Sequence, residues 1–182
     1  MSTKVVTQGT VRFSYANVFE ARAMNEGEDA KYSTSVLIPK SDEVTVNQIK
    51  RAIEAAKLEG KALWGNKIPA ELKTPLRDGD AARPDDEAYK GHWFFNCSTK
   101  TKPMVIGTDR SKIESDDEFY SGCYGRVSVN FYPFSVRGNK GVAVGLNNIL
   151  KTADGERLGG GGTSAIDDFE EFLEETDNDF LL

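Results

Sequence analysis

The chain has 182 residues, of which 38% are hydrophobic and 29% charged, and its formal net charge is −6. This length allows one domain of about 150 residues plus a further segment. No apolar run approaches the roughly 20 residues of a membrane-spanning helix, and the N-terminus lacks a signal-peptide core, so we expect a cytoplasmic protein without membrane contact. Two cysteines, Cys97 and Cys123, make no disulfide framework and are expected to be small buried side chains.

Two segments among the first 40 residues have the pattern of β-strands. Residues 11–15 alternate apolar and polar side chains, which is the two-residue period of a half-buried strand. Residues 32–38 form a second β-rich run that ends at Pro39. The first part of the chain therefore predicts two strands.

One helix is predicted after these strands. Thr45 and Gln48 have the spacing of a capping box, so we expect the helix to begin at Thr45. The helix should end at Gly60. Its apolar stripe consists of Ile49, Ala52, Ile53 and Ala56.

A long connection and further strands follow. Residues 65–91 are rich in Gly, Pro and Asp, which predicts a functional or mobile loop. Strand patterns resume at residues 92–97 and 103–106, and two longer strands at 123–134 and 141–150 are joined by a Gly-Asn hairpin signal. Five or six strands with a single helix favour a mainly β protein, a small closed or partly closed antiparallel barrel.

The predicted strand at 123–132 has one face that mixes aromatic and polar side chains. Its pleat directs Cys123, Gly125, Val127, Val129 and Phe131 to one side and Tyr124, Arg126, Ser128, Asn130 and Tyr132 to the other. The segment 92–100 divides in a similar way, with Trp93, Phe95 and Cys97 on the apolar face and His92, Phe94, Asn96, Ser98 and Lys100 opposite.

Aromatic rings beside cations on a sheet face suit single-stranded DNA (ssDNA), because bases stack on the rings while cations neutralise phosphates. The alternative is that the rings fill the core, which we favour for Trp93, Phe95 and Phe131 and leave open for the others. The predicted stacking residues are Phe94, Tyr124 and Tyr132. The predicted phosphate contacts are Lys100, Lys102, Arg126, Arg137 and Lys140.

Other site chemistries have little support. His92, Cys97 and Cys123 lack the paired spacing of zinc ligands, and one histidine without a GxSxG motif gives no basis for a Ser/His triad. The loop aspartates could hold Mg²⁺ for a nuclease, although acids are common in such loops. They are Asp78, Asp80, Asp85, Asp86, Asp116 and Asp117. We therefore predict no metal, no cofactor and no catalysis.

The segment from residue 158 to 182 differs in composition from residues 1–157. It contains four consecutive glycines and eight acids without a lysine or arginine, whereas residues 1–157 carry a net charge of +2. We expect a disordered acidic tail that follows a domain of residues 1–157. An acidic tail can serve only to keep a protein soluble, but the apolar residues among these acids favour docking into a basic pocket of a partner, or into the chain's own basic groove. The residues predicted to bind partners are Asp167, Asp168, Phe169, Asp179 and Phe180.

Several motifs resemble those of bacteriophage ssDNA-binding proteins with an OB-fold core. They lie at residues 32–39, 75–80, 91–96, 120–124, 127–134 and 138–148. The resemblance covers nearly the whole chain and implies an OB-fold-like five-stranded barrel that binds ssDNA without sequence preference in phage replication or recombination. It also implies that the tail recruits replication proteins, and it places the protein in the bacterial host cytoplasm.

Two other functions stay open from the sequence. A phage assembly or adaptor protein would use the aromatic face to contact protein, and a Mg²⁺-dependent nuclease would use the loop aspartates. The sequence also leaves open whether the protein forms a homodimer.

Overall fold

The computed structural model describes residues 2–23 and 26–158. Two of the elements, η1 and η2, are 3-10 helices. In chain order the elements are β1 (Lys4–Val6), β2 (Val11–Arg22), β3 (Lys31–Pro39), α1 (Glu43–Glu59), η1 (Gly60–Trp64), β4 (Arg77–Asp78), α2 (Gly79–Ala82), η2 (Glu87–Tyr89), β5 (His92–Thr99), β6 (Met104–Ile106), β7 (Tyr124–Val136) and β8 (Asn139–Ala153).

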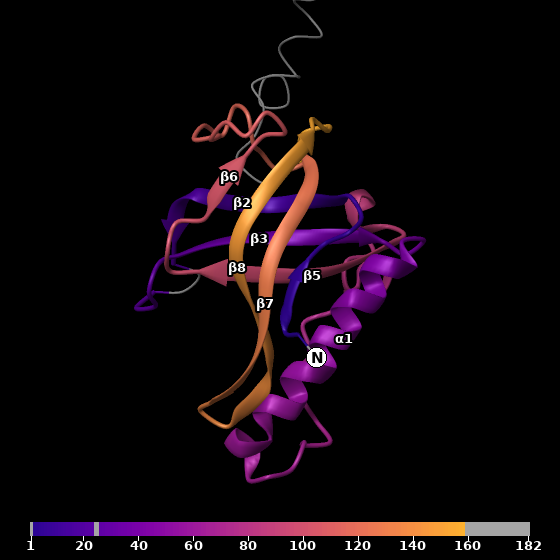
Figure 1. The fold of residues 1–182 in the computed structure, drawn as a ribbon, viewed down its shortest axis with the longest axis vertical. Coiled ribbons are helices and arrows are strands. Elements are labelled where there is room, and N and C mark those ends of the chain that lie inside the picture. The colour runs from indigo at the N-terminus through magenta and orange to yellow at the C-terminus, as the bar shows by residue number, and fades with distance from the viewer. Residues whose placement is uncertain (1, 24–25, 159–182) are drawn as a thin grey trace, which may run out of the picture.

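Five of the strands close into a barrel. The order of neighbours is β7, β2, β3, β5 and β8, and the pairing of β7 with β8 completes the ring. Pairing between the strands is antiparallel, including that of β7 with β8, except that β8 lies parallel to β5 and to β6. In Figure 1 the β7–β8 hairpin crosses over β2, β3 and β5, and α1 runs beside the lower half of the hairpin. This closed five-stranded arrangement with one main helix confirms the expected OB-fold-like barrel.

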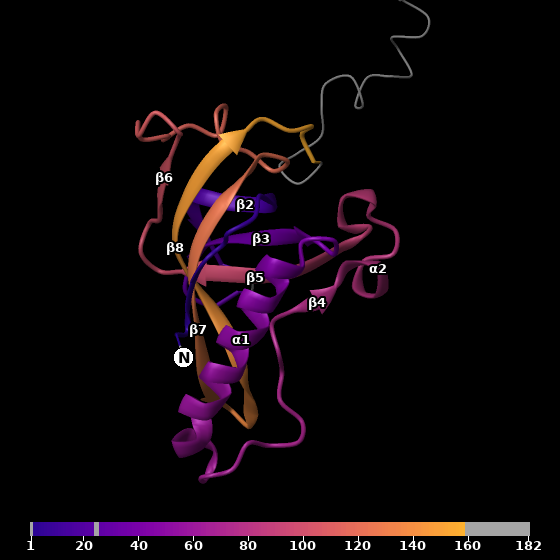
Figure 2. The ribbon, with the colours of Figure 1, turned by 45° about the vertical axis from the view of Figure 1, so that its right-hand side comes forward.

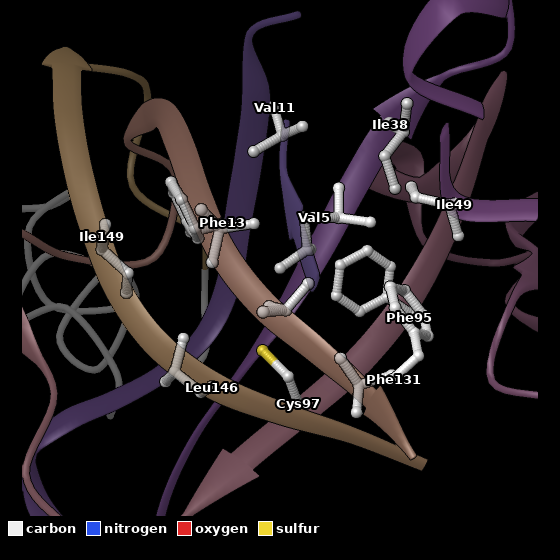
Figure 3. Close-up of a cluster of buried hydrophobic side chains, with 14 of the residues drawn as sticks. Val5, Val11, Phe13, Ile38, Ile49, Phe95, Cys97, Phe131, Leu146 and Ile149 are labelled. Carbon is white, nitrogen blue, oxygen red and sulfur yellow. The ribbon is translucent and has the colours of Figure 1, made fainter. Parts of the chain in front are cut away.

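The core fills the space between the hairpin and the β2–β3–β5 side of the barrel (Figure 3). The rings of Phe95 and Phe131, from β5 and β7, meet edge to face with their centroids 5.8 Å apart. Both side chains are buried, as the pleat of their strands predicts. The two cysteines are also buried and unpaired, which confirms the expectation from the sequence.

Helix α1 buries the predicted stripe but begins at a different residue. Asp42 is the N-cap, and its side chain accepts a hydrogen bond from the backbone N–H of Thr45. The predicted capping box is wrong because its side chains bind the segment between β1 and β2 instead. Thr45 Oγ1 accepts from Gly9 N at 2.9 Å, and Gln48 Oε1 accepts from Gln8 N at 3.0 Å.

The β7–β8 hairpin turns one residue earlier than its Gly-Asn signal indicated. Val136 pairs with Asn139, so Arg137 and Gly138 form the turn, with φ of 50° and 81°. Two consecutive positive φ values are typical of a type I′ hairpin turn, which matches the twist of the strands.

The connection between α1 and β5 is partly structured rather than a plain loop. It contains β4, α2 and η2, and β4 pairs with β5 (Figure 2). Within residues 2–23 and 26–158, no helix is long and apolar enough to cross a membrane.

Candidate nucleic-acid interface

A groove of about 860 Å³ lies on the outer face of β2, β3 and β5. Its floor is made of small polar side chains, since Ser33 pairs with Ser98 and Ser35 with Asn96 across β3 and β5. Residues 27–29, between β2 and β3, and Arg137 in the hairpin turn also line it. In an OB-fold this face and the two corresponding loops are where oligonucleotides bind.

Five cations line the groove against two acids. Lys100 forms an ion pair with Asp29 at 3.0 Å, and both side chains are largely exposed. Such an exposed pair contributes little to stability, so a phosphate can compete for the lysine. The five cations are Arg22, Lys31, Arg83, Lys100 and Arg137, and the acids are Glu28 and Asp29. The positive balance favours an anionic ligand.

Arg83 lies among three aromatic rings, of which Tyr15 lines the groove and Tyr89 and Phe94 are buried beside it. Its guanidinium carbon lies 5.3 Å from the ring centroid of Tyr15, 5.2 Å from that of Tyr89 and 5.7 Å from that of Phe94. Its Nε atom is buried without a hydrogen-bond partner among the described residues. A planar guanidinium stacked on rings can continue a stack of bases and donate to a phosphate.

Tyr15 projects from an irregular part of β2. The pairing of β2 with β3 shifts its register between Ser14 and Asn17, and Tyr15 has a φ of 48°. A bulge of this kind re-aims side chains, and a positive φ is unfavourable for a residue with a Cβ. The ring of Tyr15 lines the groove with 43% of the residue exposed. Strained backbone that presents an exposed ring to a groove is a typical feature of a binding site.

An ion-pair cluster fixes the short segment that carries Arg83. Lys40 Nζ lies 2.7 Å from carboxylate oxygens of both Asp78 and Asp80. Asp80 also accepts a hydrogen bond from Gly91 N at 3.1 Å. The hydrogen bonds from Lys40 lower the pKa of both aspartates, and those to the aspartates raise the pKa of Lys40. These contacts hold α2 against the ends of β3 and β5, and with it the position of Arg83.

Comparison with known proteins gives the family of the chain. Residues 3–181 match the family described as Enterobacter phage Enc34, ssDNA-binding protein. The chain belongs to this family. A protein named p50 from Acyrthosiphon pisum secondary endosymbiont phage 1 is 31% identical over 171 residues, which cover 88% of this chain and 90% of the relative. The family resemblance predicted from the sequence is confirmed, and the family is one of DNA-binding proteins rather than enzymes.

Solved structures of phage ssDNA-binding proteins share the fold. The bacteriophage Enc34 protein in complex with ssDNA superposes with a TM-score of 0.76 at 25% identity, covering 86% of this chain and 90% of that chain. The bacteriophage T7 protein gp2.5 gives a TM-score of 0.58 at 16% identity, covering 90% of this chain and 98% of that chain. At that identity the likeness to gp2.5 shows the fold alone.

The residues predicted from the sequence to bind ssDNA lie on two surfaces of this Enc34-family protein. Lys100 and Arg137 line the groove. Tyr124, Arg126 and Tyr132 lie on the outer face of β7, as their pleat predicts, but not among the groove-lining residues. Because the core separates the hairpin from the β2–β3–β5 side, these two outer faces are directed away from each other (Figure 1).

Two predicted lysines lie outside the groove lining. Lys102 is exposed just after β5, and Lys140 is half-buried in β8 near the hairpin turn. The backbone carbonyl of Lys140 accepts a hydrogen bond from Lys73 N at 3.0 Å. This contact holds the segment before β4 against the hairpin.

The predicted exposure of Phe94 is wrong. Phe94 is fully buried in a second small cluster with Leu37 and Tyr89, and its ring meets that of Tyr89 at a centroid distance of 4.9 Å. Phe94 does point away from the main core, as its pleat predicts. However, η2 supplies Tyr89 and covers that face of β5, so no ring surface of Phe94 remains for a base.

Tyr15 and Arg83 are groove residues that the sequence does not predict. Tyr15 was assigned to a regular strand, and only an alternation that continues poorly after it hints at the bulge. Arg83 lies in the predicted long loop, and its contact with Tyr15 joins segments far apart in the chain. The predicted tail residues Asp167, Asp168, Phe169, Asp179 and Phe180 lie outside the described residues.

The described residues offer no cation site. In residues 2–23 and 26–158, no three His, Cys, Asp or Glu side chains are placed to hold a metal ion. Two of the loop aspartates, Asp78 and Asp80, bind Lys40 instead.

Proposed function

We propose that this chain binds ssDNA without sequence preference in the groove on β2, β3 and β5. The observation that carries the proposal is the pair formed by Tyr15 and Arg83, an exposed ring and a planar cation that meet at one edge of a positively charged groove. Bases stack on such a platform by their faces, which all four bases share, so binding tolerates any sequence.

The polar floor of the groove fits this ligand. Ser33, Asn96 and Ser98 are small and uncharged, so an unpaired strand can approach the sheet closely and exchange hydrogen bonds with it. The cations around the floor neutralise phosphates and release counterions. The Enc34 protein has been solved in complex with ssDNA, which supports the same ligand class for this chain.

A titration of a poly-pyrimidine oligonucleotide and of a duplex of equal length tests the proposal. The single strand should bind more tightly, and log Kobs should fall with log salt by about 0.7 per phosphate contact. Arg83→Ala should weaken binding, whereas Arg51→Ala, at an exposed position of α1, is the matched control and should not. Equal affinity for both DNA forms would refute single-strand binding, and no salt-dependent affinity at all would favour the protein-binding adaptor instead.

We further propose that the protein acts in phage DNA replication or recombination in the host cytoplasm, and that its acidic tail both recruits replication proteins and competes with DNA for the groove. Eight acids without a cation in residues 158–182 give the tail the charge of a nucleic acid, and the groove carries the opposite charge. Deleting residues 158–182 should raise ssDNA affinity, most strongly at low salt where screening is weakest. Unchanged affinity would exclude the competition, and unchanged capture of replication proteins by the truncated chain would exclude recruitment.

A further inference from the structure

The β7–β8 hairpin is a long ribbon without acidic residues. Residues 124–153 contain no Asp or Glu and four Lys or Arg, whereas the rest of residues 1–157 contain 21 acids. At that density about five acids would be expected in a segment of this length. The hairpin forms one side of the barrel and extends beyond it (Figure 1), and without acids of its own its outer face does not repel an anionic ligand.

The outer face of the hairpin carries amides between an aromatic ring and a cation. Asn130 Nδ2 donates to Asn147 Oδ1 at 3.3 Å, and Asn147 Nδ2 donates to Ser128 Oγ at 3.4 Å. Asn147 reaches both partners because it is the extra residue at the register shift, where Ser128 pairs with Asn148 and Val129 with Leu146. Each of these amides keeps further donor and acceptor capacity for a base or a sugar.

Tyr132 marks one end of this face and Arg126 the other. Tyr132 is 44% exposed, and its Cε1 atom lies 3.7 Å from the place where a Cβ at Gly145 would be. The ring therefore lies beside a residue without a side chain, which leaves its surroundings flat. Arg126 is exposed six residues earlier, about 20 Å away along the strand.

The strand register joins this face to the groove. Ser98, which lines the groove, pairs with Gly145 in the parallel contact of β5 with β8, and Gly145 pairs with Asn130 of β7. Neighbouring strands lie about 4.8 Å apart, so the step from Ser98 to Asn130 is about 10 Å. The three residues of this step, Ser98, Gly145 and Asn130, are small or uncharged.

The hairpin is also held in place where it leaves the barrel. Trp64 Nε1 donates to the carbonyl of Phe134 at 3.1 Å, and Lys73 hydrogen-bonds through its backbone to Lys140 and Val142. A face with a fixed position requires little ordering when a ligand binds.

We propose that ssDNA leaving the groove crosses the β5–β8 junction and continues along the outer face of the hairpin, where a base stacks on Tyr132 and a phosphate contacts Arg126. This inference rests on the proposed function and extends its site. Short DNA occupies the groove alone, and only longer DNA reaches the hairpin. The protein therefore has two contact surfaces for one strand, on two sides of the barrel.

The test compares oligo-dT of about 5 nucleotides, near the small end of the usual OB-fold site sizes, with oligo-dT of about 20 nucleotides, which exceeds them. Full-length wild type, Tyr132→Ala, Arg126→Gln and the control Arg51→Gln are titrated by fluorescence anisotropy, with thermal melting to verify folding. Tyr132→Ala should weaken binding of the long oligonucleotide about tenfold and leave the short one unchanged. Arg126→Gln should reduce the salt slope by about 0.7 for the long oligonucleotide only.

Other outcomes would overturn the inference. If Tyr132→Ala and Arg126→Gln bind both lengths as wild type does, the hairpin face does not contact DNA. If they weaken both lengths equally, the hairpin is the primary site and not an extension. If the groove proposal itself is wrong, Tyr15→Ala should bind the short oligonucleotide with the affinity of wild type, which distinguishes that failure from a failure of the hairpin inference.

Discussion

Replacing Tyr15 by glycine and by alanine separates the strain of its backbone from the contact of its ring. A φ of 48° costs a residue with a Cβ about 1–2 kcal/mol and costs glycine almost nothing. At an ordinary strand position, glycine is instead less stable than alanine by about 0.5–1 kcal/mol. The strain that glycine relieves exceeds its ordinary cost in a strand, so Tyr15→Gly should be more stable than Tyr15→Ala by about 0.5–1 kcal/mol. This is a difference of about 1–4 °C in Tm for a domain of this size.

Both substitutions should weaken ssDNA binding to the same extent. Each removes the ring, and stacking of one base contributes about 1–3 kcal/mol, or about a 5- to 150-fold change in Kd. Urea or thermal unfolding measures the stability difference, and anisotropy with a short oligo-dT measures the affinity. Tyr15→Phe keeps the ring and should bind within about twofold of wild type.

Two results would refute this reasoning. If Tyr15→Ala is the more stable of the two variants, the positive φ does not strain the backbone in the folded protein. If both variants bind short oligo-dT as tightly as wild type, the ring of Tyr15 does not contact the bases. The two results are independent, so one part of the reasoning can fail while the other stands.

Three further predictions concern burial and charge. Phe94→Leu should lower the free energy of unfolding by about 1 kcal/mol in urea titrations and leave ssDNA affinity within about twofold, whereas a stacking role would require a much larger loss of affinity. Lys40→Met should be less stable than wild type at pH 7. Lys40 lowers the pKa of Asp78 and Asp80 below 3.8, so the stability that these aspartates contribute is present above pH 3.8 and is lost as the pH falls through their lowered pKa values. The variant lacks this contribution, so its free energy of unfolding should fall less than that of wild type between pH 7 and pH 3. Burial raises the pKa of Cys97 to about 12, and both cysteines are buried, so a thiol reagent at pH 8 should label none in the native protein and two in urea.

The local patterns of the sequence determined most of the secondary structure. A two-residue period located β2, a β-rich run located β3, strand patterns and a Gly-Asn signal located β5 and the β7–β8 hairpin, and a helical stripe located α1. The pleat of β7 also gave the correct inner and outer faces over ten residues, because each face of a strand in a closed barrel meets either the core or the solvent. The same argument failed for β5 at Phe94, where a segment close in sequence covers the outer face.

The groove itself depended on contacts that no local pattern encodes. Arg83 meets Tyr15 across 68 residues of chain, and Lys100 meets Asp29 across 71, so each pair exists only once the barrel has closed. The parallel contact between Ser98 and Gly145 likewise joins the groove to the hairpin only through the closure of β5 on β8.

By itself the sequence determined most of the strands, the helix, the family and the charge difference between residues 1–157 and residues 158–182, because these follow from periodicity, motifs and composition. The tertiary structure decided which rings stay exposed and which cations face one groove. Burial of a side chain depends on what packs over it, and only the folded chain brings η2 over Phe94 and leaves Tyr15 beside Arg83 in the groove.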